Sequence, residues 1–193
     1  MIRREDCIEV PYGWVIVIAS LLLHSIALGA PNVLFVAFKP IAADLGSLRT
    51  VPSFAYSLLM IGSGVGGIAM GLWMDKREVI QPVLFGAVMI GLGAIVASQS
   101  ETRWGLYVAN GVLIGLLGSS EMIAPLVTNA TRWFARRRGL AVAIIASGEG
   151  ASGAIWPRVL RFLNNSVGWR ETCFYFGVFA LAVIFPLALT LRH

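Results

Sequence analysis

Residues 133–153 read WFARRRGLAVAIIASGEGASG, and this stretch indicates the class of fold. Three consecutive arginines, Arg136, Arg137 and Arg138, are followed by a run of small and apolar residues that contains one carboxylate, Glu149. Basic residues gather in the cytoplasmic loops of membrane proteins, and a charged residue inside an apolar span usually has a function. The stretch therefore predicts a basic loop at one membrane face, followed by a membrane-spanning helix.

The whole chain has the composition of a helical membrane protein. Of its 193 residues, 58% are hydrophobic and 13% are charged, which is roughly half the charged fraction of a soluble domain. The net charge of +5 comes from basic residues in short loops between apolar blocks, where membrane topology accounts for them. We therefore expect the lipid bilayer as a partner and no nucleic acid, cofactor or metal.

Six apolar stretches divide the chain, each near the roughly 20 residues that a helix needs to cross a membrane. The predicted spans are 13–37, 52–74, 80–98, 105–128, 139–160 and 171–191. The joining loops are short, so we predict an all-α membrane protein in which residues 1–193 form a single six-helix bundle. Glycines four residues apart predict close contacts between these helices. The pairs are Gly62 and Gly66, Gly67 and Gly71, and Gly111 and Gly115.

The distribution of lysine and arginine predicts the orientation of the bundle. With the N-terminus inside, nine of the 15 basic residues fall on the cytoplasmic side, including the Arg136–Arg138 cluster. We therefore predict an integral, multi-pass protein with both termini in the cytoplasm, and we expect a prokaryotic inner (plasma) membrane. The cluster acts mainly as a topology determinant in this interpretation, and contact with lipid headgroups is the alternative.

Several motifs resemble the major facilitator superfamily. The sequence GLWMDKR at Gly71–Arg77 is similar to its loop signature, with Gly71, Asp75 and Lys76 in matching positions and Glu78 where the signature has glycine. Residues 133–153 resemble the fourth loop and fifth helix of its monocarboxylate-porter and oxalate:formate-antiporter-like branch. Further matches to that branch are residues 12–14, 29–31, 38–40, 156–157 and 168–170.

The resemblance implies a secondary transporter, not an enzyme, built from two six-helix halves with the substrate path between them. This chain corresponds to the first half. We therefore predict the N-terminal half of a transporter that moves a small organic anion or metabolite, with carboxylates as candidates, by alternating access. A second six-helix half or a homodimer partner is implied.

The sequence also allows two alternatives to a transporter half. One is a transport-inactive six-helix fragment or scaffold that needs a second half or oligomerisation. The other is an intramembrane hydrolase, since His24 and several serines are available. The serines are Ser63, Ser119 and Ser120. They form no recognisable motif with the histidine, and two histidines cannot supply a metalloprotease site, so we predict no catalytic residues.

Four polar residues inside the spans are candidates for the proton or substrate path: His24, Asn32, Glu121 and Glu149. At 1.5 Å per residue, His24 and Glu149 both lie roughly 15 Å into their spans, near the middle of the bilayer. A carboxyl group at such depth must face protein or water, or be protonated. We therefore consider His24 with Glu149 or Glu121 as a proton-coupling pair, and fixed hydrogen bonds within the bundle as the alternative. The resembled branch has lysine at the Asn32 position, which argues against a simple monocarboxylate.

The candidate cytoplasmic gate consists of Gly71, Asp75, Lys76 and Arg77. The resemblance implies that the aspartate bonds near the start of a helix in the opposite half and stabilises the outward-facing state. A carboxylate at an exposed helix N-terminus gains about 0.3–1 kcal/mol, which can bias a conformational equilibrium. The alternative is that Lys76 and Arg77 only fix the topology.

Overall fold

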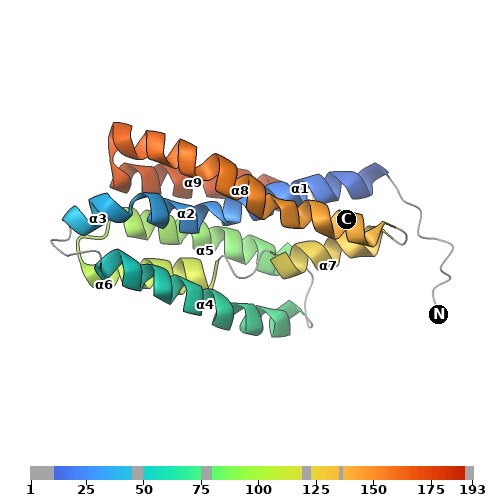
Figure 1. Cartoon of the computed structure of the whole chain (residues 1–193). Coiled ribbons are helices and arrows are strands. Elements are labelled where there is room, and N and C mark those ends of the chain that lie inside the picture. Colours follow the sequence, from blue (N-terminus) through green and yellow to red (C-terminus); the bar gives the residue numbers. More distant parts are fainter. Residues whose placement is uncertain (1–10, 45–49, 75–79, 119–122, 135–136, 190–193) are drawn as a thin grey trace.

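The computed structural model describes residues 11–44, 50–74, 80–118, 123–134 and 137–189, and within them all regular structure is helical. The longer helices run side by side as an elongated bundle (Figure 1). Five helical stretches of the described residues are long and apolar enough to cross a membrane. The predicted all-α membrane class is therefore confirmed.

The first predicted span is folded as a chain of helices. It comprises α1 (Pro11–Ala27) and α2 (Gly29–Val36), and α3 (Phe38–Asp44) follows. Backbone hydrogen bonds continue across both junctions, from Leu28 N to His24 O at 3.1 Å and from Ala37 N to Val33 O at 3.0 Å. The three helices therefore carry the chain along the bundle with only local bends.

The remaining helices follow in the order of the predicted spans. They are α4 (Thr50–Met74), α5 (Ile80–Ser98), α6 (Arg103–Tyr107), the π-helix η1 (Val108–Leu116), α7 (Ile123–Trp133), α8 (Arg138–Val167) and α9 (Trp169–Leu189). The region predicted as one span over 105–128 is divided among α6, η1 and α7. Hydropathy does not distinguish π from α geometry, so the sequence pattern could not show this division.

The helix α8 continues seven residues beyond the predicted end of its span at Leu160. Hydropathy identifies the apolar part of a helix, whereas backbone hydrogen bonds continue until the chain can turn away. Gly168 has a φ of 88°, a conformation that side-chain-bearing residues rarely adopt. This glycine ends α8 and lets α9 begin at the next residue, Trp169.

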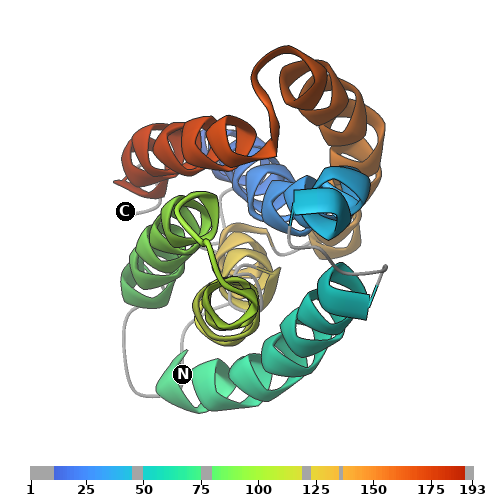
Figure 2. The same ribbon diagram turned by 90° about the vertical axis from the view of Figure 1, so that its left-hand side faces the viewer.

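Three pairs of helices make the most extensive contacts: α1 with α8, α4 with η1, and α5 with α9. Seen from the end of the bundle, α5 and α9 lie side by side, and α3 lies between α8 and the beginning of α4 (Figure 2). In terms of the spans predicted from the sequence, the first pairs with the fifth, the second with the fourth, and the third with the sixth. If each of the first three predicted spans is exchanged with the span three places later, the same three pairs result. Such symmetry is typical of folds built from internal repeats.

The close helix contacts predicted at Gly62 and at the pair Gly111 and Gly115 are confirmed. A Cβ atom on Gly62 would meet the carbonyl oxygen of Gly111, and one on Gly115 would lie 2.7 Å from the carbonyl oxygen of Leu59. Here α4 and η1 approach so closely that only glycine fits. The second predicted pair differs, because Gly67 and Gly71 have no such neighbour within 4 Å among the described residues.

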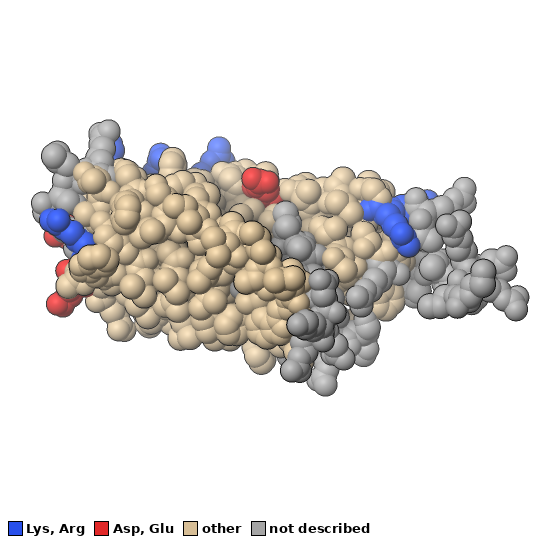
Figure 3. Space-filling model, turned by 90° about the horizontal axis from the view of Figure 1, so that it is seen from below, with Lys and Arg blue, Asp and Glu red and all other residues tan. Residues whose placement is uncertain are grey.

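The outside of the bundle is apolar along most of its length. Large hydrophobic side chains such as Ile68 and Phe162 are each 72% exposed. On the face in Figure 3, lysine and arginine atoms lie at the two ends and along one edge, and the surface between the ends is uncharged except for one acidic group near that edge. A soluble protein would rarely expose so large an apolar surface, whereas lipid or other membrane helices can cover it.

Candidate functional site

The centre of the candidate site is His24, near the end of α1. Its side chain is buried, with 5% exposure, and both ring nitrogens lack a hydrogen-bond partner among the described residues. The hydroxyl oxygen of Ser20, one turn earlier on the same face, is also buried and unpartnered. Most buried polar groups in proteins are hydrogen-bonded, so two exceptions on one helix face call for a functional explanation.

The helix α8 approaches His24 at Gly148. A Cβ atom on Gly148 would lie 3.0 Å from the carbonyl oxygen of Leu21 and 3.3 Å from Cδ2 of His24. The absence of a side chain at this position therefore allows α1 and α8 to come together. The next residue, Glu149, is exposed on the surface of α8 and directly follows the glycine that packs against His24. The structure thus brings together two of the four residues predicted for the path.

A third predicted residue, Asn32, contacts α8 one turn beyond Gly148. Its Nδ2 atom donates to the carbonyl oxygen of Leu28 at 2.9 Å and to the hydroxyl of Ser152 at 3.2 Å. Ser152 is buried, with 1% exposure. The uncharged amide is therefore held between two helices by both hydrogen bonds. It lies along the same contact between the first and fifth spans as the His24–Glu149 pair.

The indole of Trp156 fixes the same helix contact further along α8. Its Nε1 atom donates to the carbonyl oxygen of Ser25 at 2.8 Å. Its ring packs edge-on against Phe176 of α9, with the ring centroids 5.2 Å apart. These contacts hold α1, α8 and α9 together next to the predicted path.

The basic loop before α8 is partly described. The guanidinium Nε of Arg138 donates to the carbonyl oxygen of Phe134 at 2.6 Å. Phe134 is buried and packs edge-on against Trp14 at a centroid distance of 5.0 Å. Arg138 therefore links the end of α7 to the start of α8, beside the start of α1. Arg137 immediately precedes α8, and Arg136 lies outside the described residues.

Several other predicted site residues lie outside the described part of the chain. These are Glu121 and the gate residues Asp75, Lys76 and Arg77. Gly71, the first residue of the gate motif, lies on α4 with no packing atom within 4 Å of a hypothetical Cβ among the described residues. The gate and the role of Glu121 stay predictions.

Two helices present open, glycine-rich faces. Gly64, Gly67 and Gly71 recur on one side of α4, where a Cβ would have no neighbour within 4 Å among the described residues. The same holds on α8 for Gly139, Gly150 and Gly153. Since α2 contacts both α4 and α8, these faces belong to helices that flank the first span.

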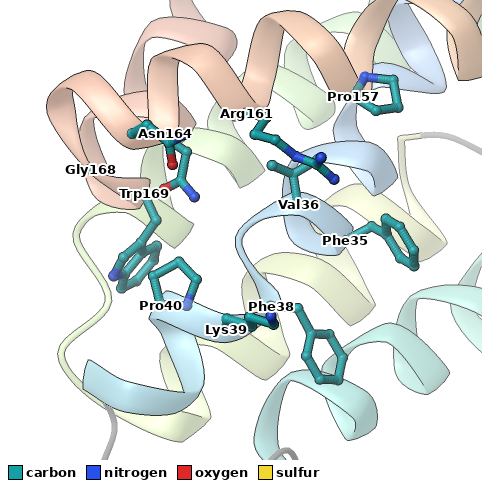
Figure 4. A pocket seen from close by; sticks show the side chains of 11 residues that line it. Phe35, Val36, Phe38, Lys39, Pro40, Pro157, Arg161, Asn164, Gly168 and Trp169 are labelled. Atoms are coloured by element: carbon teal, nitrogen blue, oxygen red, sulfur yellow. The ribbon is translucent and has the colours of Figure 1, made fainter.

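Sequence reasoning missed a hollow at the end of the bundle where α3 and the α8–α9 junction lie. Its volume is about 820 Å³. It is bordered by Phe35 and Lys39 on one side and by Arg161, Asn164 and Trp169 on the other (Figure 4). The signal in the sequence was weak, because the two cations are 122 residues apart and each resembles an ordinary residue at the end of a span.

Comparison with known proteins identifies the relatives of this arrangement. Residues 17–193 match the family model described as Major Facilitator Superfamily. Monocarboxylate transporter 6 of Mus musculus is 27% identical over 177 residues, which cover 92% of this chain and 38% of the relative. Monocarboxylate transporter 11 of Homo sapiens is 29% identical over 188 residues, with coverage of 92% and 39%.

A fungal protein gives a similar match. The MFS-type transporter pynF of Aspergillus niger is 25% identical over 177 residues, which cover 90% of this chain and 40% of the relative. The chain thus spans about two fifths of the length of the curated relatives it matches.

Proposed function

The chain belongs to the Major Facilitator Superfamily, and from this premise we propose that it forms the N-terminal half of a secondary transporter. In this proposal it moves a small organic anion across a membrane by alternating access, with both termini in the cytoplasm. Relatives named as monocarboxylate transporters support an organic anion as substrate. The match to about two fifths of their length supports a role as one half of the transport machinery.

The open glycine faces of α4 and α8 are the observation that carries the proposal. Glycine on a membrane helix allows close approach of another helix, and lipid chains gain little from such a surface. Gly62 and Gly148 use this property inside the bundle, where each approaches a neighbouring backbone. Gly67 and Gly153 are equally small and have no such neighbour among the described residues. We infer that a second six-helix half packs on these faces and that the substrate passes between the halves.

The His24–Glu149 pair is the proposed proton-coupling element. Glu149 lies one turn before Gly153, so its carboxylate shares the face that meets the second half in this proposal. The preceding residue, Gly148, packs against His24, so this carboxylate adjoins the buried imidazole of α1. Movement of the second half away from α8 would change the surroundings of the carboxylate and hence its proton occupancy.

In this half, the proposed substrate contact is the uncharged side chain of Asn32, which binds an anion more weakly than a cationic side chain would. Asn32 can offer hydrogen bonds but carries no positive charge, and it already donates to Ser152. We propose that the second half supplies the main mid-membrane charge for an anionic substrate. Asp75, Lys76 and Arg77 form the cytoplasmic gate in the same proposal.

Proton coupling is tested by Glu149→Gln in a transporter assembled from this chain and a second half. In proteoliposomes, we expect the variant to lose substrate accumulation driven by a pH gradient. Exchange of labelled for unlabelled substrate should continue, because it needs no net proton movement. Glu171→Gln is the matched control, since Glu171 is an exposed carboxylate in the first turn of α9. Unchanged pH-driven accumulation by Glu149→Gln would refute the coupling role.

A further inference from the structure

The hollow beside Lys39 and Arg161 contains two positive charges that no described residue compensates. Both side chains are exposed, and neither has an ion-pair or hydrogen-bond partner among the described residues. Arg161 extends from α8 over the hollow toward α2, and Lys39 lies on the opposite wall (Figure 4). Two cations that border one hollow favour occupation by an anion.

A nearby carboxylate is already engaged by other groups. Asp44, at the end of α3, accepts a hydrogen bond from Nε1 of Trp169 at 3.0 Å. The same carboxylate oxygen forms an ion pair with Nε of Arg170 at 3.5 Å. Asp44 therefore balances Arg170 and leaves Lys39 and Arg161 available to a ligand.

The hollow has a third polar group and apolar walls. The side-chain oxygen of Asn164, a residue that lines the hollow, is buried and has no hydrogen-bond partner among the described residues. Phe35, which is 66% exposed, and Pro157 form apolar parts of the wall. The volume of about 820 Å³ falls within the range of roughly 300–1,000 Å³ that holds small organic ligands.

We propose that this hollow binds an amphipathic organic anion. A carboxylate or phosphate head lies between Arg161 and Lys39, and an apolar body packs against Phe35 and Pro157. Arginine suits this role because its planar guanidinium donates two parallel hydrogen bonds to such a head group. The inference rests on the proposed function for its role, since the hollow would be the first contact of an anionic substrate on the outer side. Binding itself requires no transport.

The test uses the purified full chain in lipid nanodiscs of zwitterionic phosphatidylcholine, with radiolabelled benzoate as the probe in equilibrium dialysis. We expect saturable binding of benzoate and no binding of benzamide, its uncharged analogue. Arg161→Gln should weaken binding about tenfold or more, as expected for loss of a charged hydrogen-bond donor. Arg161→Lys keeps the positive charge but lacks the two parallel N–H donors of the guanidinium, so it should weaken benzoate binding less. Lys39→Gln should also weaken binding.

The matched control is Arg158→Gln. Arg158 lies one turn from Arg161 on α8 and carries the same charge, but it borders a neighbouring hollow and not this one. Because Arg158 does not border this hollow and acts on an anion there only through a solvent-screened charge, its loss should change benzoate affinity by about twofold. Equal effects of Arg158→Gln and Arg161→Gln, or no saturable binding of an anion, would overturn the proposal.

A second arm distinguishes a soluble anion from a lipid headgroup. The dialysis is repeated in nanodiscs that contain phosphatidylglycerol. Undiminished benzoate binding assigns the hollow to a soluble carboxylate. If phosphatidylglycerol lowers benzoate binding to the unaltered chain but not to Arg161→Gln, the same anion site is assigned to a lipid headgroup. Competition that persists in Arg161→Gln contradicts the site.

Transport assays separate this inference from the proposed function. Suppose that Arg161→Gln abolishes benzoate binding, but the unaltered chain transports no anion when paired with a second half. This result would support the site and reject the transport function. Wild-type transport and wild-type benzoate binding in Arg161→Gln would reject the site and leave the transport function intact.

Discussion

Gly148 and Gly153 lie on the same helix but in opposite surroundings. The Cβ position of Gly148 faces the backbone of α1 at 3.0 Å and His24 at 3.3 Å, whereas that of Gly153 has no neighbour within 4 Å among the described residues. Leucine at either position tests whether the two faces of α8 differ as proposed. Gly148→Leu disturbs the α1–α8 contact inside this chain. Gly153→Leu disturbs only the contact with the second half.

The size of the effect follows from this geometry. Leucine at position 148 needs space that two packed helices occupy, and overpacking typically costs about 1–3 kcal/mol. For a chain of this size, 1 kcal/mol corresponds to roughly 2–4 °C in melting temperature, so we expect Gly148→Leu to melt about 2–12 °C lower. Gly153→Leu meets no neighbour among the described residues. Glycine is about 0.8–1 kcal/mol less favourable in a helix than alanine, and leucine ranks just below alanine. The melting temperature of this variant should stay the same or rise.

The assay combines thermal unfolding in detergent with a measurement of association between the chain and a second half. Gly148→Leu should lower the melting temperature. Gly153→Leu should melt like the unaltered chain and fail to associate with the second half. If Gly153→Leu melted as low as Gly148→Leu, its face would be packed within the chain. If it associated normally, that face would not meet the second half.

Two further substitutions probe contacts that the structure defines. Gly168→Ala should lower the melting temperature by roughly 2–12 °C, because its backbone conformation (φ 88°, ψ 169°) is almost restricted to glycine and costs other residues about 1–3 kcal/mol. An unchanged melting temperature would contradict the turn between α8 and α9. Ser152→Ala removes the interhelical acceptor of Asn32 and leaves its bond to Leu28. Since interhelical hydrogen bonds average about 0.6 kcal/mol in membranes, it should lower the melting temperature by only about 1–2 °C. In transport assays Ser152→Ala should alter KM for the substrate, and an unchanged KM would separate Asn32 from the substrate path.

The membrane class and the family could be predicted from the sequence because their signals are local. Long apolar runs determine which segments cross a membrane, and the stretch at 133–153 carries the family resemblance within 21 residues. The geometry of the individual helices could be predicted less well from the sequence. The π-helix Val108–Leu116 has the same hydropathy as an α-helix, and the end of α8 depends on the backbone of Gly168.

For the candidate site, the sequence could predict only how deep each residue lies in the membrane. Counting residues along each span places His24 and Glu149 at a similar level in the membrane. Whether they face each other depends on how α1 and α8 are rotated, and Gly148 determines this through its contact with Leu21 and His24. The partner of Asn32 was not predicted, because Ser152 looks like one of many small residues on α8.

The central claim is that this chain transports an organic anion only together with a second six-helix half. The direct measurement is uptake of radiolabelled lactate and oxalate into proteoliposomes under an imposed pH gradient. It compares the chain alone, at less than one copy per vesicle, with two assemblies. In one assembly, two copies are joined by a flexible linker. In the other, the chain is expressed with the part of monocarboxylate transporter 11 that it does not match. We predict uptake by an assembly and none by the single chain. Equal uptake by the single chain, or no uptake by either assembled and folded pair, would contradict the account.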